Sequence, residues 1–194
     1  MVNPNEVRII CEGRTDKNNL KNLINHMNEE EHLKFNVTDN SFIVMGNKSY
    51  LLDDKSAGYC TLLNQVKLNI VTKLLFIVDA DDVKDNATSG GFINTQQKIG
   101  DLITSLNIAG ISDYFIACDP NTKTGYFESL LLSTVDKELK KCYEEFLNCS
   151  KLTAKDNQKT IMEELHRLTK PDKPYDFSHP NFDELKRKLK NLLS

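Results

Sequence analysis

Residues 73–81 read KLLFIVDAD, and this stretch decides the fold. It contains an unbroken apolar run at residues 74–78, and continuous apolar character is typical of a strand that is covered on both faces. Strands of this kind occur in parallel sheets that carry helices on both sides. Two carboxylates, Asp79 and Asp81, follow the run. The stretch therefore predicts a buried parallel strand with acidic side chains at its carboxyl end.

The sequence around this strand alternates between strand-like and helix-like segments. Short apolar, β-branched runs predict further strands at residues 7–11, 42–45 and 114–118. Apolar residues at helical spacing predict helices over about residues 16–30, 56–69 and 91–106, the first of them capped by Thr15 or Asp16. This alternation implies βαβ crossovers and a mainly parallel, four-stranded, Rossmann-like sheet flanked by helices. We assign this α/β domain to residues 1–124.

Residues 125–194 show no strand pattern and are expected to form a helical extension packed on the α/β domain. The expected helices lie at residues 126–132, 137–146, about 155–168 and 182–193, with a proline-containing loop at 170–180. In the last helix, leucines at helical spacing alternate with the basic run at residues 186–190, which is typical of an amphipathic helix with its lysines in water. Contact of that run with a phosphate backbone is the alternative.

Composition and charge exclude several classes of protein. The 194 residues are 39% hydrophobic and 27% charged, which fits a soluble globular domain and excludes collagen-like and mucin-like chains. With 25 basic and 28 acidic residues the net charge is −3, so no global electrostatic attraction to nucleic acid or anionic membranes is expected. The five cysteines include no C-x-x-C pair. With no signal peptide or membrane-length apolar run recognised, we expect a soluble protein of the reducing cytoplasm that does not bind membranes.

The candidate chemistry lies where the strands end. In open parallel sheets, functional groups gather at the carboxyl ends of the strands. The first strand ends at Glu12, so a 2-1-3-4 strand order would bring Glu12, Asp79 and Asp81 into one crevice. Carboxylates that lie so close repel one another unless a cation neutralises them, and oxygen ligands without His or Cys favour Mg²⁺ or Mn²⁺ over zinc. The alternative is that these aspartates only form turns or cap helices, because a lone D-x-D is a weak signal.

Two motifs of this sequence resemble two motifs that occur in the same order in toprim domains, the module shared by topoisomerases and primases. Residues 7–16, VRIICEGRTD, resemble the first motif, and residues 74–81, LLFIVDAD, resemble the second, D-x-D motif. The resemblance covers about the first 120 residues. It implies a compact α/β fold, Mg²⁺ held by Glu12, Asp79 and Asp81, and chemistry on nucleic-acid phosphodiesters. Glu12 would act as a metal-linked or acid/base group.

Further positions extend the resemblance. Asp16 matches a second acidic position of toprim nucleases of the overcoming-lysogenisation-defect type, which implies a further metal ligand. The chain is also similar to small stand-alone toprim-like bacterial proteins, in which a G-x-x-E segment follows the fourth strand; here it runs from Gly125 to Glu128. Many toprim domains place a glycine soon after D-x-D, whereas this chain reaches one only at Gly90. That departure leaves the conformation of the loop open.

Four side chains outside the central motifs have two interpretations each. Glu128 would be a metal ligand or would stabilise the start of a helix through the helix dipole. Lys123, in the loop after the fourth strand, would stabilise charge at the reacting phosphorus or would be an ordinary solvated lysine. Arg14 and Lys84 would contact substrate phosphates or would likewise remain in water.

These observations favour a small Mg²⁺- or Mn²⁺-dependent nuclease acting on DNA or RNA. Glu12, Asp79, Asp81 and Lys123 would be catalytic, and Asp16 and Glu128 would be outer or second-metal ligands. The roughly 70 residues after the α/β domain leave no room for the partner domains of a topoisomerase or a complete primase. The alternative is a catalytically inactive toprim-fold module that binds or regulates a protein partner, such as an ATPase or a defence-system protein.

Overall fold

The computed structural model describes residues 6–84, 86–151, 161, 164, 167–168 and 175–194. The helix expected over about residues 155–168 and the first half of the loop expected at 170–180 fall outside these ranges, apart from isolated positions. Within the described residues, no helix is both long enough and apolar enough to cross a membrane.

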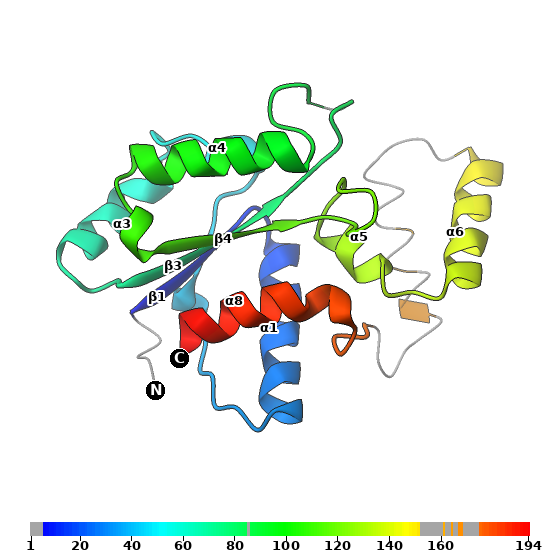
Figure 1. Ribbon diagram of the computed structural model, residues 1–194, viewed down its shortest axis with the longest axis horizontal. Coiled ribbons are helices and arrows are strands. Elements are labelled where there is room, and N and C mark those ends of the chain that lie inside the picture. Colours follow the sequence, from blue (N-terminus) through cyan, green and yellow to red (C-terminus); the bar gives the residue numbers. More distant parts are fainter. Residues whose placement is uncertain (1–5, 85, 152–160, 162–163, 165–166, 169–174) are drawn as a thin grey trace.

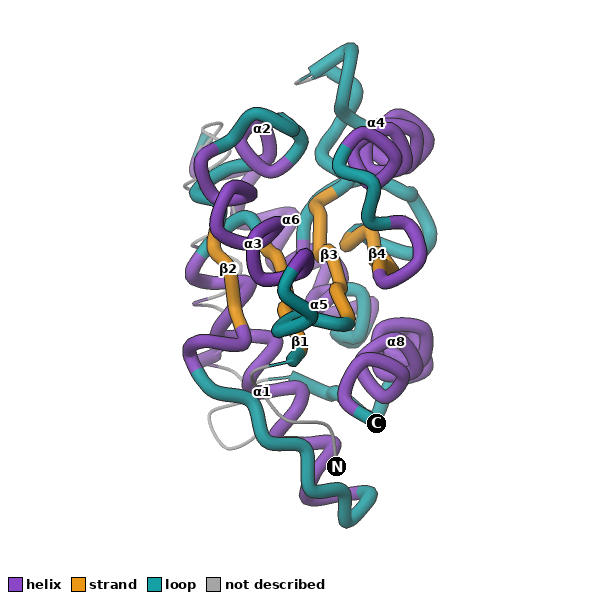
Figure 2. The backbone as a smooth tube through the Cα atoms, turned by 90° about the vertical axis from the view of Figure 1, so that its left-hand side faces the viewer, coloured by secondary structure: helices purple, strands orange, loops and turns teal. Residues whose placement is uncertain are grey.

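The centre of the fold is a parallel, four-stranded sheet. Its strands are β1 (Val7–Cys11), β2 (Phe42–Val44), β3 (Lys73–Asp79) and β4 (Ser112–Ala117). They lie in the order β2-β1-β3-β4, which confirms the expected order and makes β1 and β3 neighbours. Every residue of β3 after Lys73 is buried, as its unbroken apolar run predicts. Figure 2 shows β2 at one edge of the sheet.

Helices cover both faces of this sheet. They are α1 (Arg14–Glu30), α2 (Lys48–Leu51), α3 (Ala57–Lys67), α4 (Phe92–Ser105), α5 (Phe127–Leu132), α6 (Lys137–Ser150) and α8 (Asp183–Leu193). α3 and α4 lie on one face, and α1 and α8 lie on the other (Figure 1). The four-residue helix α2 is not expected from the sequence, because one turn is too short to show periodicity.

Alternate residues of β3 face the two layers. Leu75 and Ile77 pack with α1, α5 and α8, whereas Leu74, Phe76 and Val78 pack with α2, α3 and α4. The leucines of α8 are buried in the first of these cores, as their spacing predicts. α5 and α8 therefore share a hydrophobic core with β1 and α1. This packing fixes both strands that carry the acidic motifs.

The start of α1 differs from the sequence prediction. The helix begins at Arg14 after Gly13, whereas the sequence predicted a cap at Thr15 or Asp16. Asp16 instead lies in the first turn, where its Oδ2 accepts a hydrogen bond from the Gly13 N–H at 2.7 Å. The carboxylate thus satisfies a backbone donor from inside the helix, and the helix can begin two residues earlier than expected.

Candidate functional site

Glu12 and Asp79 lie together at the carboxyl ends of β1 and β3. Oε1 of Glu12 accepts a hydrogen bond from the Asp79 N–H at 2.9 Å. The parallel pairing of the two strands produces this contact, since Ile10 lies opposite Phe76 and both chains then leave the sheet at the same edge. We call Glu12, Asp16, Asp79 and Asp81 the carboxylate cluster.

The environment of Glu12 favours its protonated form. The pKa of Glu12 is raised to about 7, because burial and the neighbouring charges of Asp81 and Asp16 raise it by more than the Asp79 N–H and Lys48 lower it. A carboxyl group with this pKa exchanges a proton near neutral pH, and a nearby cation would favour its ionised form. Perturbed carboxyl groups of this kind concentrate at functional sites.

Asp79 connects β3 to the start of α5. Its Oδ1 accepts a hydrogen bond from the Phe127 N–H at 2.9 Å, and its side chain is buried. Glu128 follows in the first turn of α5 and is only 2% exposed. The Tyr126 N–H donates to Oγ of Ser129 at 3.0 Å, so Asp79 and Ser129 both accept backbone donors at this end of α5. The metal-ligand and helix-dipole interpretations of Glu128 both stay predictions.

Asp81 is held in a left-handed backbone conformation, with φ of 59°. Its N–H donates to the Gly125 carbonyl at 2.7 Å, and the Gly125 N–H donates back at 3.0 Å. Gly125 itself has φ of 95°, and a Cβ at this position would lie 2.3 Å from Oγ of Ser129. Glycine is therefore required at the first position of the G-x-x-E segment, where it fixes the D-x-D loop.

Lys48 is the main residue of the site that the sequence analysis missed. It opens α2, is 7% exposed, and forms an ion pair with Oδ2 of Asp81 at 3.1 Å. Its Nζ also donates to the carbonyl oxygens of Asp79 and Ala80 at 2.6 and 3.0 Å and to Oγ1 of Thr95 at 2.9 Å. The available signal was its position just after the second strand, at the edge of the sheet where functional groups gather.

The loop after the D-x-D segment returns to the sheet at two consecutive glycines, Gly90 and Gly91. The Gly91 N–H donates to the Ala80 carbonyl at 2.8 Å, and the Gly90 N–H donates to Asn86 at 2.7 Å. A Cβ on Gly90 would lie 2.3 Å from the Asp82 carbonyl oxygen, so only glycine allows this close approach. The loop therefore closes on the end of β3 although its glycines come later than in many toprim domains.

The predicted basic residues lie around the cluster and are exposed. Arg14 is the first residue of α1, and Lys84 lies in the loop after Asp81. The ammonium group of Lys123 lies over the Phe92 ring, 5.4 Å from its centroid. Their roles toward a substrate stay predictions.

Three further side chains at this edge of the sheet, one acid and two thiols, have structural explanations. Asp119, after β4, accepts hydrogen bonds from the Asn121 N–H at 2.9 Å and from Lys140 at 3.0 Å. Burial raises the pKa of Cys11 to about 12, and it also raises the pKa of Cys118. Both thiols therefore stay protonated and are unsuited to nucleophilic attack.

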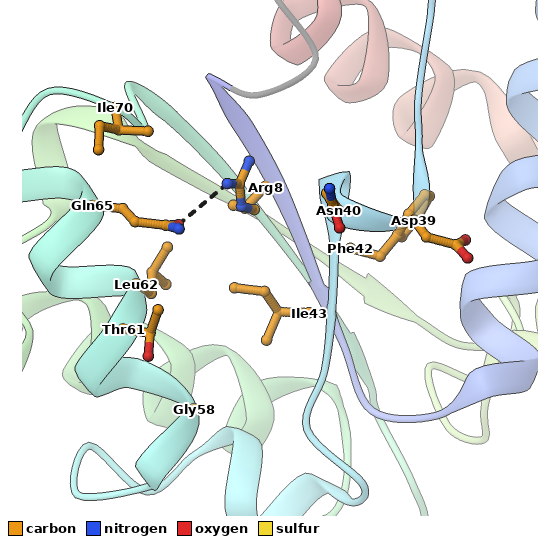
Figure 3. Close-up of a pocket in the computed structure, with 10 residues that line it drawn as sticks. All are labelled: Arg8, Asp39, Asn40, Phe42, Ile43, Gly58, Thr61, Leu62, Gln65 and Ile70. Atoms are coloured by element: carbon orange, nitrogen blue, oxygen red, sulfur yellow. Dashed lines mark hydrogen bonds between the residues drawn. The ribbon is translucent and has the colours of Figure 1, made fainter.

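A hollow of about 650 Å³ lies elsewhere, between β2 and α3 (Figure 3). Arg8 lines it and donates to Oε1 of Gln65 at 3.2 Å. Arg8 lies four residues before Glu12, which is about 13 Å along a strand. The residues that line this hollow include none of the carboxylate cluster, so it is separate from the candidate site.

The donor chemistry of the cluster fits a hard divalent cation, because all of its side chains offer carboxylate oxygens. Within the described residues, no group of three or more His, Cys, Asp or Glu side chains is arranged to hold a metal ion. The protein itself supplies a donor to each carboxylate, from the backbone for Glu12, Asp16 and Asp79 and from Lys48 for Asp81. A bound cation would share these oxygens with, or take them from, the present donors.

The fold and the site define an α/β protein with a carboxylate cluster and a buried lysine at the carboxyl edge of a parallel sheet. No family model matches the chain, and no match is found among curated proteins or solved structures. Any functional assignment therefore depends on the geometry of the cluster and on the resemblance of the two motifs.

Proposed function

We propose that this protein is a toprim-like, Mg²⁺- or Mn²⁺-dependent phosphodiester hydrolase that acts on DNA or RNA. The observation that supports this most is the meeting of Glu12 with the D-x-D segment at the ends of two adjacent parallel strands. The near-neutral pKa of Glu12 adds a group suited to proton transfer. The motif resemblance provides the substrate class.

The side chains have distinct roles in this proposal. Asp79 and Asp81, together with Glu12, would hold the cation. When bound, the cation would polarise a phosphoryl oxygen and help to deprotonate water. Glu12 would accept the proton that water releases during hydrolysis, because a bound cation would favour its ionised form. Arg14 and Lys84 are exposed beside the cluster and would contact flanking phosphates.

The test is a cleavage assay with single-stranded and duplex DNA and RNA in Mg²⁺ or Mn²⁺. The double variant Asp79→Asn plus Asp81→Asn keeps the size of both side chains and removes two negative charges. We expect it to cleave at least about 100-fold more slowly than the wild type. Asp82→Asn is the matched control, because Asp82 follows the motif directly and its Oδ1 accepts the Lys84 N–H within the same loop. Equal cleavage by the double variant and the control would contradict the proposal.

A second candidate is a catalytically inactive module that binds or regulates a protein partner. The observation that favours it is that a donor of the protein already satisfies each carboxylate of the cluster. The net charge of −3 points the same way, because unaided capture of nucleic acid is favoured by a basic surface. Calorimetric titration with Mn²⁺ separates the two candidates. No heat of binding at millimolar Mn²⁺ would support the inactive module.

A further inference from the structure

The ammonium group of Lys48 has the surroundings of a bound cation. Four oxygens lie within 3.1 Å of it: two backbone carbonyls, the hydroxyl of Thr95 and a carboxylate oxygen of Asp81. A lysine ammonium has only three N–H donors, so one of them is shared between two acceptors. Carbonyl, hydroxyl and carboxylate oxygens are also the ligands that proteins offer to hard metal ions.

The backbone of the D-x-D segment is held in place without Lys48. The Ala80 N–H donates to the Ala117 carbonyl at 2.9 Å, and the Gly91 N–H donates to the Ala80 carbonyl at 2.8 Å. Asp81 exchanges two backbone hydrogen bonds with Gly125. The loop therefore has enough hydrogen bonds to keep its course when the lysine is replaced. These backbone hydrogen bonds do not supply a positive charge beside Asp81, and Lys48 does.

That charge lies against the carboxylate of Asp81, with which Lys48 forms an ion pair at 3.1 Å. Lys48 is buried, so water screens its charge less than it would at the surface. A divalent cation that entered the cluster would be repelled by the ammonium group and attracted by the carboxylates.

We propose that Lys48 is the built-in cation of the carboxylate cluster, and that it occupies a position that a second metal ion would otherwise take. The cluster then binds one divalent cation instead of two. This inference rests on the proposed function only for the divalent cation itself. It assigns an electrostatic role to a residue that neither motif contains.

The test is calorimetric titration of the apoprotein with Mn²⁺. The wild type is expected to bind one equivalent. Lys48→Met, which removes the charge and keeps the length of the side chain, is expected to bind Mn²⁺ at least about tenfold more tightly, because the repulsion is lost. Lys55→Met is the matched control, since Lys55 is exposed and lies seven residues further along the chain; its affinity should stay within about twofold of the wild type.

The Mn²⁺ affinity of the variant and the number of Mn²⁺ ions bound by the wild type each test the inference. Unchanged or weaker Mn²⁺ binding by Lys48→Met overturns the inference, because it would mean that the lysine only supports the fold. Circular dichroism checks that the variant is folded; if it is not, Lys48→Gln, which keeps an N–H donor for the carbonyls, takes its place. Two equivalents bound by the wild type overturn the inference whichever variant folds.

Failure of the proposed function gives a different result. If the wild type binds no Mn²⁺, the metal-dependent hydrolase is contradicted. The inference about Lys48 then depends on the variants alone: binding gained by Lys48→Met or Lys48→Gln supports it, and no gain overturns it.

Discussion

Two acids at the same edge of the sheet, the buried Asp119 and the partly buried Glu12, have pKa values that are shifted in opposite directions. Burial by itself raises the pKa of Asp119, but hydrogen bonds from the Asn121 N–H and Lys140 outweigh burial and hold this pKa below its ordinary value. Burial also dominates at Glu12, where the opposing donors are too weak, and the pKa rises to about 7. Asp119 is therefore a structural group that is ionised at neutral pH. Glu12 remains able to exchange a proton at neutral pH, which distinguishes a candidate functional acid from a structural one.

The largest expected effect comes from Glu12→Gln. The folded-state pKa of about 7 lies above the ordinary value of 4.5, so the folded protein binds more protons than the unfolded chain between these values. The wild type should therefore lose stability as pH rises from about 4.5 to about 7, by an amount on the order of 3 kcal/mol. Glutamine cannot ionise but still accepts the Asp79 N–H, so the variant should lack this loss. In the proposed hydrolase its cleavage rate should fall by about 100-fold or more.

Urea unfolding at pH 5 and pH 8 measures the first effect, and the cleavage assay measures the second. Glu29→Gln is the matched control, because Glu29 is exposed on α1. The control should keep the pH dependence of the wild type. If Glu12→Gln also keeps it, Glu12 is already ionised at pH 5, and the contrast with Asp119 disappears.

The opposite sign is expected for Asp119→Asn. An acid with a lowered pKa contributes stability above its unfolded value of about 3.8, and that stability is lost as pH falls below it. Asparagine still accepts the Asn121 N–H but loses the charge opposite Lys140. At pH 7 the free energy of unfolding should fall by about 1 kcal/mol, a modest value because Lys140 is partly exposed to water.

Urea unfolding curves at pH 7 and pH 3 test this prediction. The variant and the wild type should differ at pH 7, and the difference should shrink at pH 3, because the unfolded chain then holds the Asp119 proton and the folded protein begins to bind it. Asp136→Asn is unsuitable as a control because Asp136 caps α6; Asp101, which is exposed in the last turns of α4, is the better choice. A variant as stable as the wild type at pH 7 would show that Lys140 contributes nothing to the ionisation of Asp119.

The sequence predicted the fold well because the deciding signal is local. The apolar run of β3 and the alternation of strands and helices were enough for a parallel sheet, and parallel strands bring Glu12 and Asp79 to one edge. The predicted start of α1 was wrong because Asp16 accepts the Gly13 N–H from within the helix. The preference of Asp for N-cap positions does not distinguish this geometry from a true N-cap.

The details of the site could not be predicted because they depend on distant contacts. Lys48 binds Asp79 and Thr95, which lie 31 and 47 residues further along the chain. The choice between a backbone donor and a cation for each carboxylate is likewise set by the packing of α2 and α5 against the end of β3. Residue types along the chain indicate which acids converge, but they do not indicate which donors those acids bind.

The smallest expected effect is a shift in the midpoint of Glu12 in Asp16→Asn, which tests what makes Glu12 differ from Asp119. Asp16→Asn keeps an oxygen for the Gly13 N–H, so α1 should begin at the same residue, but it removes a negative charge that acts on Glu12. The midpoint of Glu12, followed through its side-chain carboxyl carbon by ¹³C NMR, should move to lower pH. It should stay above that of an exposed glutamate, because burial is the largest cause of the increase and the variant does not change it.

Asp39→Asn is the control: it also removes one negative charge next to α1, where Asp39 pairs with Lys17. If both variants moved the midpoint equally, long-range charge would control Glu12; if only Asp16→Asn moves it, the proton affinity of Glu12 is set within the carboxylate cluster.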